Sequence, residues 1–157
     1  MNHQMTSENN ILDLCGKNFA EREYMDFNKY WDNCGGWYEE RGISEEEFSK
    51  FPLKEGFAKG DILLVWGRFT PKVGDIIIFY PNKESLAPRP IVHRIMDITD
   101  GVLQTKGDHN QAQLSTSNNA LKTDETHIEK DQIIGKVILR IPLLGWIKIL
   151  FTNIFQR

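Results

Sequence analysis

The chain has 157 residues, of which 40% are hydrophobic and 26% charged, a composition typical of a globular protein and unlike a disordered or multi-span membrane chain. Its net charge of −3 is uneven, because residues 1–50 carry 11 acidic and 5 basic side chains while the remainder is net basic. An acidic front end argues against nucleic acid as a partner, since phosphate contacts need clustered lysine and arginine.

The first third of the chain predicts a loose terminus followed by two helices. Residues 1–10 are polar and without periodicity. From Phe19 to Asn33 the apolar side chains recur every three or four residues, which predicts a helix that Cys34-Gly35-Gly36 ends. Ser44-Glu45-Glu46-Glu47 has capping-box spacing and predicts a short helix to about Lys50. We therefore expect a polar terminus and a helical acidic segment over residues 1–52.

From Gly60 onward the pattern changes to β. Five segments rich in Ile, Val and aromatic residues are bounded by Gly, Pro and Asn, and they predict strands at 61–66, 75–80, 91–98, 102–106 and 133–141. Because no long helix separates them, we expect a compact, mostly antiparallel, coiled β domain over residues 53–157. The fold class is therefore mainly β, or α+β with the helical insertion. Residues 111–127 are polar and predict an exposed loop.

Cys15 and Cys34 are the only cysteines, and their spacing does not suggest a metal site. Two free thiols in a reducing compartment are the favoured interpretation, and a disulfide remains an open alternative. We expect neither a metal nor a cofactor.

The sequence carries no stretch that predicts a membrane span. No window reaches the ~18 apolar residues of a span, and the N-terminus has no apolar signal core, so we expect that the chain as written does not cross a bilayer. The apolar tail at residues 141–155 is long enough to lie at a membrane surface. Packing of this tail on the core is the alternative.

Two motifs carry candidate chemistry. Pro90-Ile91-Val92-His93-Arg94-Ile95 predicts a strand that bears a histidine, and Thr105-Lys106-Gly107-Asp108 predicts a strand that ends in a tight turn. A neutral imidazole titrates near pH ~6.5 and can accept a hydroxyl proton, while a nearby carboxylate orients the ring. His93 and Asp108 are therefore the candidate base and carboxylate. The plainer alternatives are a structural histidine and a turn aspartate. Arg94 follows His93 on the opposite strand face and is expected at the surface or paired with a loop.

Five blocks in fixed order together resemble the type I signal peptidases, particularly the archaeal and endoplasmic-reticulum branch. They are Gly60-Asp61-Ile62-Leu63-Leu64-Val65, Val73-Gly74-Asp75-Ile76-Ile77-Ile78-Phe79, the His93 block, the Asp108 block, and Ile134-Gly135-Lys136-Val137 with Ile141-Pro142-Leu143-Leu144-Gly145-Trp146. The likeness covers about residues 50–150. Further forward, Gly36-Trp37-Tyr38, Phe51-Pro52 and Gly56-Phe57 resemble an insertion of some archaeal members.

The resemblance implies a membrane-anchored serine endopeptidase that removes signal peptides after small residues. Its partner is then a signal peptide or another extended polypeptide, and its place is a membrane, or the cytoplasm if the chain is truly anchorless. In that family a serine hydroxyl attacks the scissile carbonyl. His93 matches the base position, where bacterial relatives carry lysine, and Asp108 matches the supporting carboxylate.

The nucleophile is where the chain departs from the family. It has neither the Ser-Met pair nor the N-terminal membrane helix, and Gly16 falls where the serine is expected. Ser49 in Ser49-Lys50-Phe51-Pro52 is a weak candidate, and Cys15 beside the vacant position is a weaker one.

Other functional classes stay open on the sequence. A catalytically inactive homologue would bind extended peptides in the same groove by strand addition. The related self-cleaving repressors are disfavoured, because they need a basic front end and a lysine base.

Overall fold

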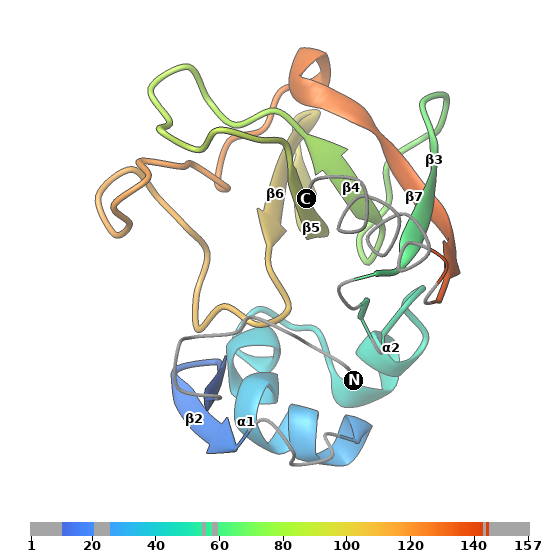
Figure 1. The fold of residues 1–157 in the computed structure, drawn as a ribbon, viewed down its shortest axis with the longest axis vertical. Coiled ribbons are helices and arrows are strands. Elements are labelled where there is room, and N and C mark those ends of the chain that lie inside the picture. The colour runs from blue at the N-terminus through green and yellow to red at the C-terminus, as the bar shows by residue number, and fades with distance from the viewer. Residues whose placement is uncertain (1–10, 21–25, 55, 58–59, 143, 145–157) are drawn as a thin grey trace, which may run out of the picture.

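The computed structural model describes residues 11–20, 26–54, 56–57, 60–142 and 144. A five-stranded antiparallel sheet forms the upper half of the molecule in Figure 1, and a two-helix unit with a small hairpin lies beneath it. The predicted mainly β class is confirmed. Among the described residues, no helix combines the length and apolar character needed to span a bilayer.

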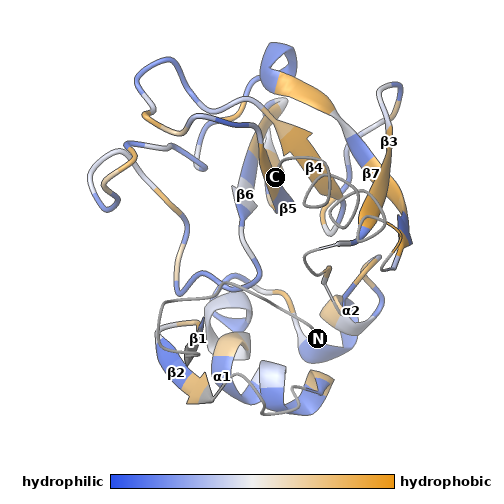
Figure 2. Ribbon diagram, in the orientation of Figure 1, coloured by the Kyte–Doolittle hydropathy of each residue, from blue (hydrophilic) through white to orange (hydrophobic). Residues whose placement is uncertain are grey.

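The main sheet has the strand order β3-β7-β4-β5-β6, with every neighbouring pair antiparallel. Its strands are β3 (Ile62–Trp66), β4 (Ile76–Phe79), β5 (Ile91–Thr99), β6 (Val102–Lys106) and β7 (Ile133–Ile141), which confirms all five predicted strands. Figure 2 shows β3 and β4 as largely apolar and most of the connecting loops as polar, while β6 and β7 carry polar residues between their apolar ones. Their β-branched composition suits a pleated, half-buried surface.

The first helix differs from its prediction. Helix α1 spans Phe27–Glu39, with the Asp26 side chain accepting a hydrogen bond from the Lys29 backbone N–H as its N-cap. It therefore begins later than Phe19 and continues through the glycine pair that was expected to end it. A β-carbon built on Gly35 would lie 2.6 Å from the Trp31 ring, so this glycine makes room for a neighbouring indole within the helix.

The second helix confirms its prediction. Helix α2 spans Glu45–Ser49 and begins with the expected capping box, in which the Ser44 side chain and the Glu47 side chain bond each other's backbone N–H. Phe48 on this helix is fully buried and packs against the aromatic side chains of α1. The cap thus fixes the start of a helix whose one large apolar residue enters the core.

A hairpin replaces the expected start of the first helix. Strands β1 (Ile11–Leu14) and β2 (Lys17–Ala20) pair across the Cys15-Gly16 turn. Cys15 forms a disulfide with Cys34 on α1. The preference for free thiols is therefore wrong, and the disulfide fastens the hairpin turn to the helix.

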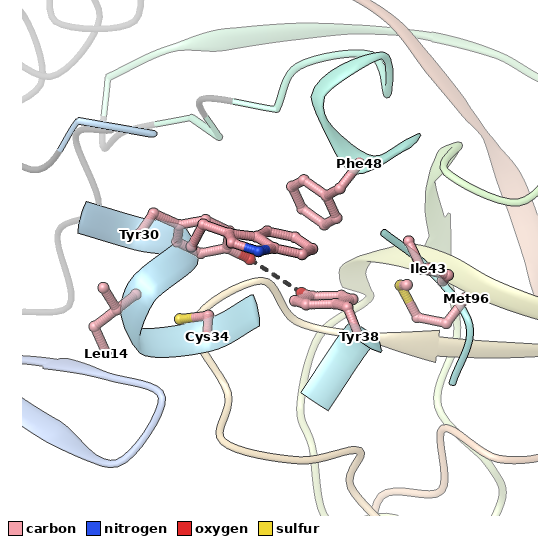
Figure 3. Close-up of a cluster of buried hydrophobic side chains, with 8 residues drawn as sticks. Leu14, Tyr30, Cys34, Tyr38, Ile43, Phe48 and Met96 are labelled. Atoms are coloured by element: carbon pink, nitrogen blue, oxygen red, sulfur yellow. Dashed lines mark hydrogen bonds between the residues drawn. The ribbon is translucent and has the colours of Figure 1, made fainter. Parts of the chain in front are cut away.

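The interior consists of two apolar clusters. One lies in the helical unit and holds Tyr30, Trp31, Tyr38 and Phe48 together with Met96 of β5 (Figure 3). The other lies within the sheet and comprises Ile77, Phe79, Ile95, Leu103 and Ile128. Because Met96 joins the first cluster while its neighbour Ile95 joins the second, β5 packs against both parts of the molecule. The loose terminus at residues 1–10 and nearly all of the apolar tail at residues 141–155 lie outside the described residues.

Candidate active site

His93 and Asp108 line the same cavity, as the sequence predicts. The cavity has a volume of about 330 Å³ and lies between β5, the turn after β6 and the segment before β3. Its lining residues are Gly56, Phe57, Ile76, Val92, His93, Arg94, Gly107, Asp108, His109, Asn110 and Leu114. None of these described lining residues carries a hydroxyl or a thiol. The described lining therefore combines imidazole rings with a carboxylate, and it contributes no hydroxyl or thiol.

The carboxylate hydrogen-bonded to His93 belongs to Glu125. Nδ1 of His93 contacts Oε1 of Glu125, whose side chain is completely buried. An ionised carboxylate only accepts hydrogen bonds, so Nδ1 carries the proton and Nε2 presents a lone pair. This is the arrangement in which an imidazole works as a general base. The sequence predicted Asp108 as the carboxylate beside His93. In the structure Glu125, which the sequence did not indicate, occupies that position.

The loop before β7 holds Glu125 in place. Its Oε2 accepts a hydrogen bond from the backbone N–H of Leu114 at 2.8 Å, and its backbone carbonyl accepts one from the N–H of Thr105 on β6 at 2.9 Å. Residues 111–127 were expected to be an exposed loop, yet Thr123 and Glu125 are both buried. The loop folds back on the outer edge of β6 and delivers a carboxylate behind the histidine. Asp124 and Glu125 are adjacent acids in a polar segment without periodicity, so no sequence signal distinguished Glu125.

Gly107 makes room for the other ring nitrogen of His93. A β-carbon built on Gly107 would lie 2.6 Å from Nε2 of His93, well inside van der Waals contact. The lone pair of Nε2 is therefore next to the backbone of the Gly107-Asp108 turn, on the wall of the cavity. The glycine of this motif is explained by the close approach of the ring.

Asp108 forms a two-point ion pair with Arg94. Nε of Arg94 donates to Oδ1 at 3.0 Å, and an NH2 group donates to Oδ2 at 2.7 Å. Burial by itself lowers the pKa of Arg94, but the charge of Asp108 and its hydrogen bonds outweigh burial and raise it. The Asp108 carboxylate is thus committed to a buried guanidinium, and its predicted role beside His93 stays a prediction.

Arg94 joins the helical unit to the sheet. Its NH1 group donates to the carbonyls of Pro52 and Gly74 at 2.8 and 2.9 Å, and its guanidinium lies 5.2 Å from the Phe48 ring centre. Arg94 was expected at the surface or paired with a loop. The surface expectation is wrong, because its side chain is fully buried, whereas the pairing with loop backbone is observed.

A buried polar chain runs beneath the same turn. Nζ of Lys106 donates to the Tyr38 hydroxyl at 3.2 Å, the two tyrosine hydroxyls of Tyr38 and Tyr30 lie 3.0 Å apart (Figure 3), and Tyr30 donates to the backbone carbonyl of Asp108 at 3.1 Å. Burial is the main cause that lowers the pKa of Lys106 to about 8 and raises the pKa of both tyrosines. Helix α1 thereby fixes the backbone on which the cavity is built.

His109 is the second histidine of the cavity wall. Burial lowers its pKa to about 4, and the charge of Asp108 opposes that shift only in part. His109 is therefore neutral at physiological pH. No group of three or more histidine, cysteine or acidic side chains in the described ranges could hold a metal ion.

The candidate nucleophiles lie elsewhere. Ser49 lines a second cavity that shares only Gly56 with the first, and its hydroxyl donates to the Glu46 carbonyl at 2.7 Å. The Cys15 sulfur is part of the disulfide and is unable to act as a thiolate. The structure therefore does not bring Ser49 to His93, and it removes Cys15 from consideration.

The hairpin turn, in contrast, adjoins the cavity wall. The backbone N–H of Cys15 donates to the His109 carbonyl at 2.7 Å, and a β-carbon on Gly16 would lie 3.0 Å from the Gln111 side chain. The position at which the resemblance expects the serine thus lies beside the turn that carries Asp108 and His109.

Catalytic subunits of signal peptidase complexes are similar in sequence to part of this chain. The Signal peptidase complex catalytic subunit SEC11 of Lachancea thermotolerans is 38% identical over 104 residues, which are 62% of this chain and 59% of that protein. SEC11 of Clavispora lusitaniae is 33% identical over 111 residues, 67% of this chain and 64% of that protein. SEC11 of Colletotrichum graminicola is 29% identical over 108 residues, 64% of this chain and 59% of that protein.

The chain is a diverged relative of the type I signal peptidases. This confirms the resemblance drawn from the five sequence blocks. None of the protein-family models matches the chain. The chain spans about six-tenths of the length of these signal peptidase subunits. The activity of the whole subunits is therefore only proposed for this chain.

Proposed function

We propose that this protein is a signal-peptidase-like endopeptidase that acts on extended polypeptides, with signal peptides as the substrate class. One observation carries the proposal: a histidine in a cavity has its Nδ1 bonded to a buried carboxylate, which leaves Nε2 at the cavity wall to accept a proton. The named relatives, which are catalytic subunits of the signal peptidase complex, support the same reaction.

His93 and Glu125 have distinct roles in the proposed reaction. As a hydroxyl attacks the scissile carbonyl carbon, Nε2 of His93 takes the hydroxyl proton, and the imidazolium later gives that proton to the leaving amine. Glu125 keeps Nδ1 protonated and stabilises the positive ring, so it is a positioning residue. Asp108 supports the site through Arg94 and the shape of its turn.

The attacking hydroxyl is the unassigned part of the proposal. Ser49 is the candidate from sequence, and its place in the second cavity means that a substrate-bound rearrangement is needed to bring it to His93. Ser49→Ala tests this directly, because loss of cleavage without loss of folding would assign the serine.

Cleavage of a synthetic signal peptide by the full chain, in detergent and in lipid, tests the proposed activity. We expect the wild-type protein to cut the peptide and His93→Ala to abolish cutting. Leu121→Ala, in the polar loop away from the cavity lining, is the matched control and should retain the wild-type rate.

The non-catalytic alternative has its own signature in this experiment. A wild-type chain that binds the peptide with measurable affinity and leaves it uncut would show an inactive homologue that holds extended chains in the groove. Such a result would overturn the proposed reaction and leave the peptide-binding part intact.

Contact of the tail at residues 141–155 with a membrane surface is a separate part of this proposal. Trp146 and Lys148 in this segment are residue types that suit the headgroup level of a bilayer. Binding of a synthetic 141–155 peptide to lipid vesicles would test this part without any reference to cleavage.

A further inference from the structure

Asn110 contributes a side-chain amide to the wall of the His93 cavity. It lies two residues after Asp108, in the turn that follows β6, and its side chain is half-buried. Its backbone N–H donates to the Gly107 carbonyl at 2.9 Å and closes this turn. The backbone contact fixes where Asn110 starts from the wall, and it leaves the side chain in the cavity lining.

The Asn110 amide lies beside the nitrogen that we assign as the base. A β-carbon built on Gly107 would lie 2.6 Å from Nε2 of His93 and 2.9 Å from Nδ2 of Asn110. The two nitrogens therefore flank the same point of the cavity wall. A lone pair on Nε2 repels the oxygen of the amide, whereas the NH2 group carries only donors. The NH2 end is thus the end of the amide that belongs on this side, as the structure has it.

The amide of Asn110 is not used to hold the fold. In the neighbouring loops, the amides of Asn82, Asn118 and Asn119 donate to backbone carbonyl groups at 3.2, 2.9 and 2.9 Å. Within the described part of the chain, no hydrogen bond involves the side chain of Asn110. An amide held at a cavity wall in this way keeps its two N–H donors for a ligand.

The other cationic or N–H-bearing side chains of the described lining are committed or buried. Arg94 is fully buried, and its guanidinium donates to Asp108 and to backbone carbonyls. Nε2 of His109 is buried as well. Among the described lining residues, Asn110 is therefore the side-chain donor that is best placed to meet a negative oxygen in the cavity.

We propose, on the basis of the proposed function, that Asn110 donates a hydrogen bond to the oxyanion formed during peptide cleavage. When the attacking hydroxyl oxygen bonds to the scissile carbonyl carbon, Nε2 of His93 takes the hydroxyl proton and the carbonyl π electrons move to the carbonyl oxygen. The NH2 group of Asn110 stabilises this negative oxygen. The carbonyl then re-forms, the C–N bond breaks, and the imidazolium gives its proton to the departing amine.

A neutral amide suits this role because its hydrogen bond is stronger to an anionic oxygen than to the carbonyl of the bound substrate. Loss of one such donor typically lowers kcat by about 100-fold or more. Asn110→Ala should therefore lower kcat for signal-peptide cleavage by about 100-fold and leave KM within about twofold of wild type. A residue that only shaped the turn would change KM and thermal stability as well.

A binding experiment on the full chain tests the same role without turnover. Two synthetic peptides have one sequence, with small residues before the scissile bond. The first keeps the scissile amide, and the second replaces it with a phosphinate, a tetrahedral anion that resembles the intermediate. By titration calorimetry, we expect wild type to bind the phosphinate at least about tenfold more tightly than the amide. Asn110→Ala should weaken phosphinate binding by about tenfold and change amide binding less than about twofold.

Three further variants serve as controls. Asn110→Asp keeps the shape of the side chain and adds a negative charge, so it should bind the phosphinate more weakly than Asn110→Ala. Asn118→Ala removes an amide that is bonded within the polar loop, and it should keep the wild-type preference for the phosphinate. Thermal unfolding shows whether each variant is folded, and Asn110→Leu, which also lacks donors, takes the place of an alanine variant that fails to fold.

The possible results separate this inference from the proposed function. The inference is overturned if wild type binds the two peptides equally, or if folded Asn110→Ala keeps the phosphinate affinity or loses affinity for both peptides alike. A wild-type chain that binds neither peptide overturns the proposed function and the inference together. An Asn110-dependent preference for the phosphinate, without cleavage of the amide peptide, supports the donor role of Asn110 and overturns the proposed activity of this chain.

Discussion

Nδ1 of His93 is hydrogen-bonded to the Glu125 carboxylate, which comes from a loop 32 residues further along the chain. Because Glu125 is buried and also accepts a backbone N–H, the ring has one defined orientation. Asp108, in contrast, is bonded through both carboxylate oxygens to Arg94. The two acids of the site therefore have different partners: Glu125 is bonded to the imidazole, and Asp108 in the cavity wall is bonded to a buried guanidinium.

Glu125→Gln should impair catalysis far more than folding. Glutamine preserves the size of the side chain and loses the negative charge that stabilises the imidazolium, so we expect kcat for signal-peptide cleavage to fall roughly 1,000-fold or more. The measurement is steady-state cleavage beside thermal unfolding. A Glu125→Gln protein with wild-type kcat would show that this carboxylate has no part in the reaction.

Gly107→Ala should displace the base. Its added methyl would lie 2.6 Å from Nε2 of His93, so the ring must move, and a shift of this size costs on the order of 100-fold in rate. Gly36→Ala is the control, because a β-carbon there meets nothing within 4 Å and the position is helical. Equal activity of the two variants would contradict the close approach of Nε2 to the turn.

Asp108→Asn should mainly destabilise the fold. Removing one partner of a buried ion pair leaves the Arg94 charge without compensation, which costs about 3 kcal/mol or more in the free energy of unfolding. Denaturant unfolding measures the loss. The double variant Asp108→Asn with Arg94→Met should recover part of it, and additive losses in the two single variants would argue against a direct pair.

Lys106 predicts a pH dependence of stability with a definite sign. Its pKa is about 8 in the folded protein and near 10.5 when unfolded, chiefly because of burial, so the unfolded chain binds more protons between these values. The free energy of unfolding should therefore rise from pH 8 to 10, by roughly 2 kcal/mol. Above pH ~10 ionisation of Tyr30 and Tyr38 in the unfolded chain reverses the trend.

Lys106→Met provides the comparison for this pH series. Methionine fills similar space without a titrating group, so its stability curve should lack the rise from pH 8 and decline slightly towards pH 10, where Tyr30 and Tyr38 begin to ionise in the unfolded chain. A wild-type curve that is flat over the same range, or one that falls, would show that burial does not lower the pKa of Lys106 in the folded protein.

The sheet could be predicted from the sequence because its signals are local. Each strand is a short run of β-branched residues bounded by Gly, Pro or Asn, and the five runs became β3 to β7 almost residue for residue. The capping box of α2 is equally local. In these segments the chain needs no distant contact to define its conformation.

The remaining features depend on contacts between distant segments. In the sequence Gly35 predicts the end of a helix, whereas in the structure it lies within α1 because the Trp31 ring packs against its α-carbon. Likewise, Asp108 has the spacing of a catalytic acid, and its pairing with a buried Arg94 follows from tertiary packing. Glu125 approaches His93 only because its loop returns to β6. His93 lines a cavity, as the sequence predicts. Its partner Glu125 lies in a polar segment that has no periodic pattern from which its position could be predicted.

The protonation of His93 tests the central claim most directly, because it requires neither a substrate nor an assigned nucleophile. In a two-bond nitrogen–proton correlation spectrum recorded at neutral pH, we expect a protonated Nδ1 and an unprotonated Nε2 for His93, and a changed balance of the two tautomers in Glu125→Gln. A proton on Nε2 in the wild-type protein would mean that the ring has no lone pair facing the cavity, and would contradict the assignment of His93 as the base.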